Sequence, residues 1–134
     1  MVRVPSKPVH SSSDICSGAL GSWGAALIEP YSDDPKTKGL MLTSPEALEK
    51  LVRQFWKDGW QTVRVYQCFN ILYKTKLISK GVHCIGDKAN HVVLDIYESI
   101  IKEGANVSEW RPRIEHAQIF TLADLERIGK LGGQ

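Results

Sequence analysis

Apolar residues recur at helical spacing in three stretches of the chain. In the first stretch, which starts near Pro45, they fall at positions i, i+3, i+4, i+7 and i+8, as one buried helix face requires. These residues are Leu48, Leu51, Val52, Phe55 and Trp56. Ser44 suits the N-cap and Pro45 the first turn, so a helix is predicted here. Gly59 is expected to end it in a left-handed conformation.

Two further helices are predicted in the second half of the chain. One runs from about residue 88 to residue 103, stops at Gly104, and has an apolar stripe of five residues. These are Ala89, Val92, Val93, Ile96 and Ile100. The other begins after Thr121, where Asp124 completes a variant capping box three residues on. Its expected buried residues are Leu122, Leu125 and Ile128.

A short strand candidate precedes each of these two helices, at residues 81–84 and 113–117. Alternation of strand and helix predicts an α/β fold with a parallel sheet and right-handed crossovers. His83 and His116 lie 33 residues apart, close to the length of one strand-helix unit of an eight-stranded barrel. Both histidines are therefore expected at equivalent carboxyl ends of strands, where such barrels carry their active sites.

Composition limits the class of protein. The chain has 134 residues, 43% of them hydrophobic, which suits one modest domain. No apolar run is long enough to span a membrane, and the amino-terminal residues lack the apolar block of a secretory signal, so a cytoplasmic location is expected. Cys16, Cys68 and Cys84 form no CxxC pair and are expected to be reduced thiols.

The charge distribution argues against nucleic-acid binding. The net charge is +2, but residues 63–80 contain four basic residues and no acidic one. The rest of the chain carries 13 basic against 15 acidic residues. A nucleic-acid interface would need basic side chains gathered on a folded face, so no nucleic-acid partner is expected.

Candidate chemistry centres on His83 and His116. Neutral imidazole is the commonest metal ligand, and ligands from adjacent strands can share an ion held about 2.1 Å from each nitrogen. The alternative is a pair of histidines that only hydrogen-bond within loops. Glu115 is a further candidate ligand, but strict alternation along a strand would turn it away from the face that His116 occupies. Asp87 is interpreted as the N-cap of the helix that follows, with a base or an orienting partner of a metal ligand as the alternative.

Four ordered motifs carry a family resemblance. They read SGALGSWGAALIEPYSDDP, GLMLTSPEALEKLV, VHCIGDKANHVVLDIYE and RPRIEHAQIFTLADLERI. Together they resemble the amidohydrolase-3 (YtcJ-like) branch of the metal-dependent amidohydrolase superfamily. The resemblance implies part of a TIM (β/α)8 barrel, covering roughly strands 4–6. It also implies hydrolysis of non-peptide carbon–nitrogen bonds of a small-molecule amide-type substrate by metal-activated water. His83 then matches the metal ligand of the fifth strand and His116 that of the sixth, with zinc the expected metal.

The departures from the family predict an incomplete enzyme. The family's first-strand His-x-His pair and eighth-strand Asp have no counterpart in the chain, Ser17 stands where the family has Asp, and Ser13 where it has a metal-site lysine. Residues 1–17 are expected to be a disordered leader, and 18–134 a partial domain. We expect the 134-residue chain alone to be inactive, with weak or absent metal binding. The alternative function is a non-catalytic remnant, pseudoenzyme or binding module.

Residues 63–80 interrupt the resemblance. Joining Thr62 to Gly81 restores GWQTGVHCIGD, the short strand expected at this point. Insertions usually enter surface loops, because a break in a buried strand costs hydrogen bonds and packing. Valine codons begin with GT and one lysine codon ends with AG, so residues 63–80 are predicted to be a translated intron.

Overall fold

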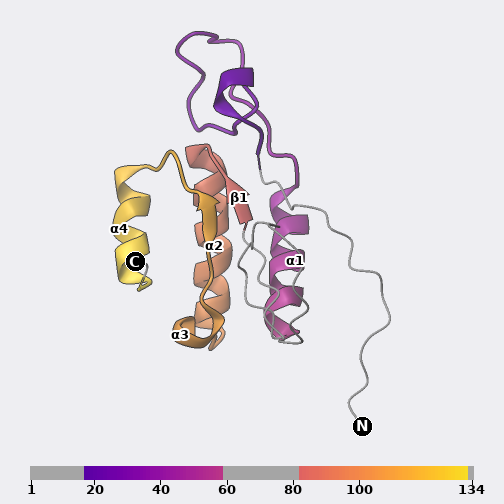
Figure 1. Cartoon of the computed structure of the whole chain (residues 1–134), viewed down its shortest axis with the longest axis vertical. Coiled ribbons are helices and arrows are strands. Elements are labelled where there is room, and N and C mark those ends of the chain that lie inside the picture. Colours follow the sequence, from indigo (N-terminus) through magenta and orange to yellow (C-terminus); the bar gives the residue numbers. More distant parts are fainter. Residues whose placement is uncertain (1–16, 59–81, 133–134) are drawn as a thin grey trace, which may run out of the picture.

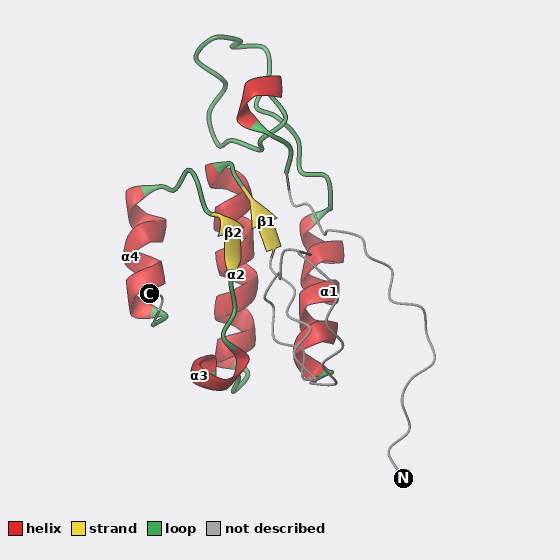
Figure 2. Ribbon diagram, viewed as in Figure 1, coloured by secondary structure: helices red, strands yellow, loops and turns green. Residues whose placement is uncertain are grey.

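The computed structural model describes residues 17–58 and 82–132 (Figure 1). After a single 3-10 turn, η1 (Leu20–Ser22), the elements are helix α1 (Pro45–Lys57), strand β1 (Val82–Cys84), helix α2 (Asp87–Lys102), the short helix α3 (Val107–Trp110), strand β2 (Ile114–His116) and helix α4 (Leu122–Lys130). Helix α2 contacts α1, α4 and β1 and lies between the other two long helices (Figure 2). The predictions that fall on Cys16, Gly59, Cys68 and the segment 63–80 lie outside the described residues.

Helix α1 begins as its sequence predicts. Ser44 is the N-cap, and its Oγ accepts a hydrogen bond from the backbone N–H of Ala47 at 3.2 Å. Pro45 occupies the first turn, where a missing N–H costs nothing. Leu48 and Val52, which are 1% and 2% exposed, enter the core, so the amphipathic pattern is confirmed.

Helix α2 supplies most of the core. Four of its five expected residues are buried, and Val92 is partly buried against the same cluster. These side chains meet Leu48 and Val52 of α1, Val82 and Cys84 of β1, and Trp110 of α3. Cys84 is buried and is not part of a disulfide, as expected for a reduced thiol. Helix α2 thus joins the sheet to α1 in one apolar cluster.

Helix α4 corrects the sequence reading. Thr121 is confirmed as its N-cap, since Thr121 Oγ1 accepts from the Asp124 N–H at 3.1 Å. The expected burial of its leucines is wrong: Leu122 is 82% exposed and Leu125 is 50% exposed. The helix faces α2 with Asp124 and Arg127 instead, because these residues meet charged partners on α2.

The two strands form a parallel sheet, as the alternation of strand and helix predicts. Their register pairs Val82 with Ile114, His83 with Glu115, and Cys84 with His116. Val82 and Cys84 are buried toward the helices, whereas His83 between them is only partly buried. The α/β class is therefore observed in the described residues.

The segment before α1 packs closely over the turn that leads into α2. Ala25 and Ala26 are buried there, and Ser17 makes an antiparallel bridge with Met41. Ser17 therefore belongs to the described fold, whereas the sequence predicts a leader that extends to residue 17. Within the described ranges, no helix is long and apolar enough to cross a membrane.

Candidate functional site

The histidine pair forms where β1 and β2 end. The ring centroids of His83 and His116 lie 4.0 Å apart, with the ring planes inclined by 64°. His83 is partly buried and His116 is exposed, so the pair has one side toward the protein and one toward solvent. The proximity predicted from the 33-residue spacing is confirmed.

The two histidines do not occupy equivalent strand positions. His83 is the middle residue of β1, and His116 is the last residue of β2, where it pairs with Cys84. A regular pleat would direct His116 to the same face as buried Cys84. His116 has φ +67° and Ala117 φ +46°, so the extended conformation stops here and the His116 ring lies beside His83.

This left-handed turn also corrects the reading of Glu115. Alternation was expected to exclude Glu115 whenever His116 faces the site. The register instead places Glu115 opposite His83, and residues paired in a parallel ladder lie on one face of the sheet. Its Oε1 lies 3.4 Å from Nη2 of Arg113, within ion-pair distance, but this buried oxygen accepts no hydrogen bond from the described residues.

The donor set suits a metal ion only in part. Two imidazoles in ring contact can share one ion, and imidazole is a good ligand for zinc and similar divalent metals. Across residues 17–58 and 82–132, however, no three His, Cys, Asp or Glu side chains gather in a way that could hold a metal. A catalytic zinc site takes about three protein ligands, so the pair fits as two of them.

Asp87 is not the N-cap of α2. The cap is Gly86, and Asp87 is the first residue of α2. Its Oδ1 accepts from the N–H of Lys88 at 2.8 Å and from the N–H of Ile28 at 3.0 Å. The capping prediction is wrong because the carboxylate fastens a segment 59 residues earlier, a contact that local sequence does not encode.

Asn90 is a site residue that the sequence reading missed. It is 0% exposed, and its Nδ2 donates to the carbonyl oxygen of Ile119 at 2.8 Å and to that of Ile85 at 3.4 Å. These carbonyls belong to the segments that follow the two histidines. An available signal was its position one helical turn before Val93 and two before Tyr97, on the buried stripe of α2. An amide side chain at a buried position of a helix is expected to form hydrogen bonds with buried partners.

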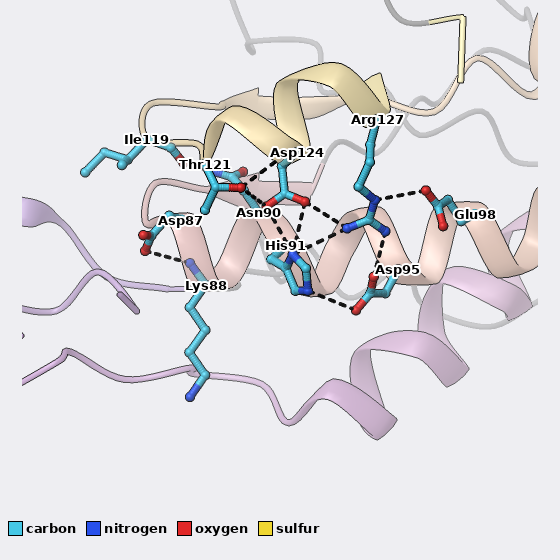
Figure 3. A network of polar contacts seen from close by, with 10 residues as sticks. All are labelled: Asp87, Lys88, Asn90, His91, Asp95, Glu98, Ile119, Thr121, Asp124 and Arg127. Atoms are coloured by element: carbon cyan, nitrogen blue, oxygen red, sulfur yellow. Dashed lines mark hydrogen bonds and ion pairs between the residues drawn. The ribbon is translucent and has the colours of Figure 1, made fainter. Parts of the chain in front are cut away.

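A charged network joins α2 to α4 beside this site (Figure 3). Arg127 donates to Glu98 at 2.9 Å, to Asp95 at 2.6 Å and to Asp124 at 2.8 Å. Asp124 also lies 3.0 Å from Nδ1 of His91 and accepts from the hydroxyl of Thr121. His91 is exposed on α2. The network places α4, and with it the segment after His116, against α2.

The electrostatics of this network favour the ionised forms. Burial alone would raise the pKa of Asp124, but hydrogen bonds from Arg127, His91 and Thr121 outweigh burial and lower that pKa below its usual value. The hydrogen bond from Arg127 likewise lowers the pKa of Glu98, and the hydrogen bond to Glu98 raises the pKa of Arg127. Asp124 is therefore a buried carboxylate that stays charged at neutral pH.

The chain is similar to known proteins over most of its length. No protein-family model matches the chain. The protein LONG AFTER FAR-RED 3 of Arabidopsis thaliana is 34% identical to it over 114 residues. The Bacillus subtilis (strain 168) protein YtcJ, named as an amidohydrolase, is 30% identical over 114 residues. Each alignment covers 85% of this chain but only 16% and 17% of the relatives, so the chain spans about a sixth of their length.

Two solved structures resemble the fold. They are crystal structures of uncharacterized metal-dependent hydrolases from Pyrococcus furiosus and Pyrococcus horikoshii, with TM-scores of 0.62 and 0.63. Both are 30% identical to this chain, and they match 89% and 90% of it over 20% of their own length. In sequence and in fold, the chain is therefore similar to part of the metal-dependent hydrolases.

Proposed function

We propose that the chain is part of a metal-dependent hydrolase of the amidohydrolase-3 type, in which His83 and His116 bind a divalent metal. The observation that carries the proposal is the contact between the two imidazole rings on adjacent parallel strands. The likeness to metal-dependent hydrolases at 30% identity supports it. A partial (β/α)8 barrel, covering roughly strands 4–6, is the architecture that we propose for this part.

The reaction is hydrolysis of a non-peptide carbon–nitrogen bond in a small-molecule amide-type substrate. A bound divalent metal, for which zinc is our choice, supplies a water nucleophile at neutral pH and polarises the scissile carbonyl. In this chain His83 and His116 would hold the ion through their ring nitrogens. Asp87 serves the site indirectly, because it fastens the segment around Ile28 to the start of α2.

We propose that the 134-residue chain has no hydrolase activity by itself. Its proposed location is the cytoplasm. Catalysis needs an ion, a positioned water and a proton-transfer group together, and the remaining members of such a unit do not compensate for a missing one. The described residues bring two candidate ligands together and no group of three. We therefore expect weak zinc binding and negligible hydrolysis.

Zinc titration of the chelator-washed chain, followed by calorimetry and by NMR of the histidine rings, tests the ligands. We expect His83→Ala or His116→Ala to abolish the weak binding. His91→Ala is the matched control, since His91 is exposed on α2 and contacts Asp124 rather than the pair. Strong stoichiometric zinc that survives His83→Ala would show that the ligands are wrong.

Activity is tested separately on a panel of N-acyl and formamide substrates with added zinc. We expect no turnover above the metal-only background. Robust zinc-dependent turnover by the 134-residue chain would refute the proposal that it is incomplete.

A further inference from the structure

We propose that Asn90 is the positioning residue of the histidine pair. Its side-chain amide fastens the segment that follows His83 to the segment that follows His116, and so keeps the two rings in contact. The link to metal binding rests on the proposed function. The link to ring geometry does not.

The amide bridges the two segments directly. Nδ2 of Asn90 donates to the carbonyl oxygen of Ile85, two residues after His83, and to that of Ile119, three residues after His116. Both partners are acceptors only, so the nitrogen of the amide must face them. Asn90 lies in the first turn of α2 and is fully buried, so water does not compete for these bonds.

The backbone at His116 and Ala117 needs stabilising hydrogen bonds from its surroundings. His116 and Ala117 are consecutive non-glycine residues with positive φ, a conformation that costs free energy and persists only where the surroundings impose it. The N–H of Ala117 donates to Cys84 at 3.0 Å, and the N–H of Ile119 donates to Ile85 at 3.0 Å. The stronger bond of Asn90, to Ile119 at 2.8 Å, holds the far end of the same turn. The direction of the His116 ring therefore depends on three bonds, one of which comes from a side chain.

The unpartnered amide oxygen of Asn90 indicates that the side chain serves as a hydrogen-bond donor here. Among the described residues, no hydrogen-bond donor reaches the buried Oδ1 of Asn90. An unsatisfied buried acceptor costs free energy that an apolar side chain would not. An asparagine here is disadvantageous for packing alone and is explained by the two carbonyls that it holds.

The test compares Asn90→Ala with Asn106→Ala in the full 134-residue chain. Asn106 is the exposed N-cap of α3, and its Oδ1 accepts from the N–H of Ser108. Its loss destabilises the chain without touching either histidine, which makes it a control for general loosening. The first readout is the NOE between the ring protons of His83 and His116 in metal-free protein, and the second is the dissociation constant for zinc.

We expect Asn90→Ala to lose most of the ring–ring NOE and to weaken zinc binding by about 10-fold, as removal of a group that orients metal ligands does. Asn106→Ala should leave both values as in the wild type. The proposal is overturned if Asn90→Ala keeps the wild-type NOE, or if both variants reduce it equally.

The two proposals fail separately. A wild-type NOE without zinc binding would reject the metal site, and the NOE of the variants would then decide the role of Asn90. If Asn90→Ala does not fold, Asn90→Leu decides instead: it fills a similar volume without any donor, and an NOE equal to that of the wild type would overturn the proposal.

Discussion

Gly86 is the residue at which the turn before α2 touches the segment before α1. A Cβ at Gly86 would lie 2.0 Å from the carbonyl oxygen of Ala26, and one at Gly39 would lie 1.9 Å from that of Ala25. Gly39 also has φ +70°, which favours glycine. The backbone at residues 25–26 can therefore lie in close contact with Gly86 and Gly39, because neither residue has a side chain.

Gly86→Ala is therefore expected to destabilise the chain by about 3 kcal/mol, the upper end for overpacking, because the methyl group would meet backbone rather than a mobile side chain. Urea unfolding measures the change. Gly129→Ala is the control: this glycine lies inside α4 with nothing within 4 Å of an added Cβ, so the substitution should stabilise by up to about 1 kcal/mol. Equal effects at both positions would contradict the close approach.

At the scale of elements, α2 is held on its two sides by different forces. Toward α1 it presents apolar residues, with Arg53 of α1 adding hydrogen bonds to Ser99 and Glu103 at the edge. Toward α4 it presents a charged row that meets Asp124 and Arg127. The first contact should respond to loss of volume and the second to pH.

The pH prediction concerns Asp124. Since its folded-state pKa lies below the usual 3.8, its contribution to stability is full above the unfolded pKa and is lost as the pH falls through the folded pKa. We expect the unfolding free energy to fall below about pH 4 and to fall less steeply in Asp124→Asn. At pH 7 this variant should cost about 1.5–3 kcal/mol, the usual range for hydrogen bonds to a charged group. Urea unfolding at pH 7 and pH 3 checks both values, and parallel pH profiles would refute the prediction.

The volume prediction compares two leucines. Leu48→Ala should cost about 2–5 kcal/mol because Leu48 is 1% exposed in the core between α1 and α2. Leu122→Ala should change stability by less than about 0.5 kcal/mol, since this side chain is 82% exposed. Thermal or urea unfolding of the two variants gives the comparison. A large loss in Leu122→Ala would mean that α4 is packed differently.

At the scale of the whole molecule, the chain corresponds to a fifth of the metal-dependent hydrolases that it resembles. In the described residues, α2 packs against the two parallel strands, and α1 and α4 pack against α2. Residues 63–80 fall between α1 and β1 and lie outside the described residues. Their prediction as a translated intron therefore rests on the sequence.

Deletion of residues 63–80 tests this prediction at the protein level. We expect the shortened chain to fold with the same ring–ring NOE and with equal or slightly greater stability, because a shorter connection costs less loop-closure entropy. Transcript sequencing supplies the independent measurement: a dominant message that retains these codons would reject the intron. A shortened chain that fails to fold would show that the segment is structural.

The sequence alone determined the local features of this protein. Helical periodicity placed α1 and α2, and Ser44 and Thr121 were read correctly as caps, because each signal depends on residues within about one turn of one another. Alternation of strand and helix predicted the parallel pair of strands, and the 33-residue spacing predicted that His83 and His116 would meet.

Tertiary structure decided what each element faces. The partner of Asp87 lies 59 residues away, the outward leucines of α4 follow from its charged contacts with α2, and the direction of His116 follows from a left-handed turn. Asn90 acquires its role only when two segments 34 residues apart come within reach of one amide. Local pattern reports which residues can form a helix or a strand, whereas these features depend on atoms that only packing brings together.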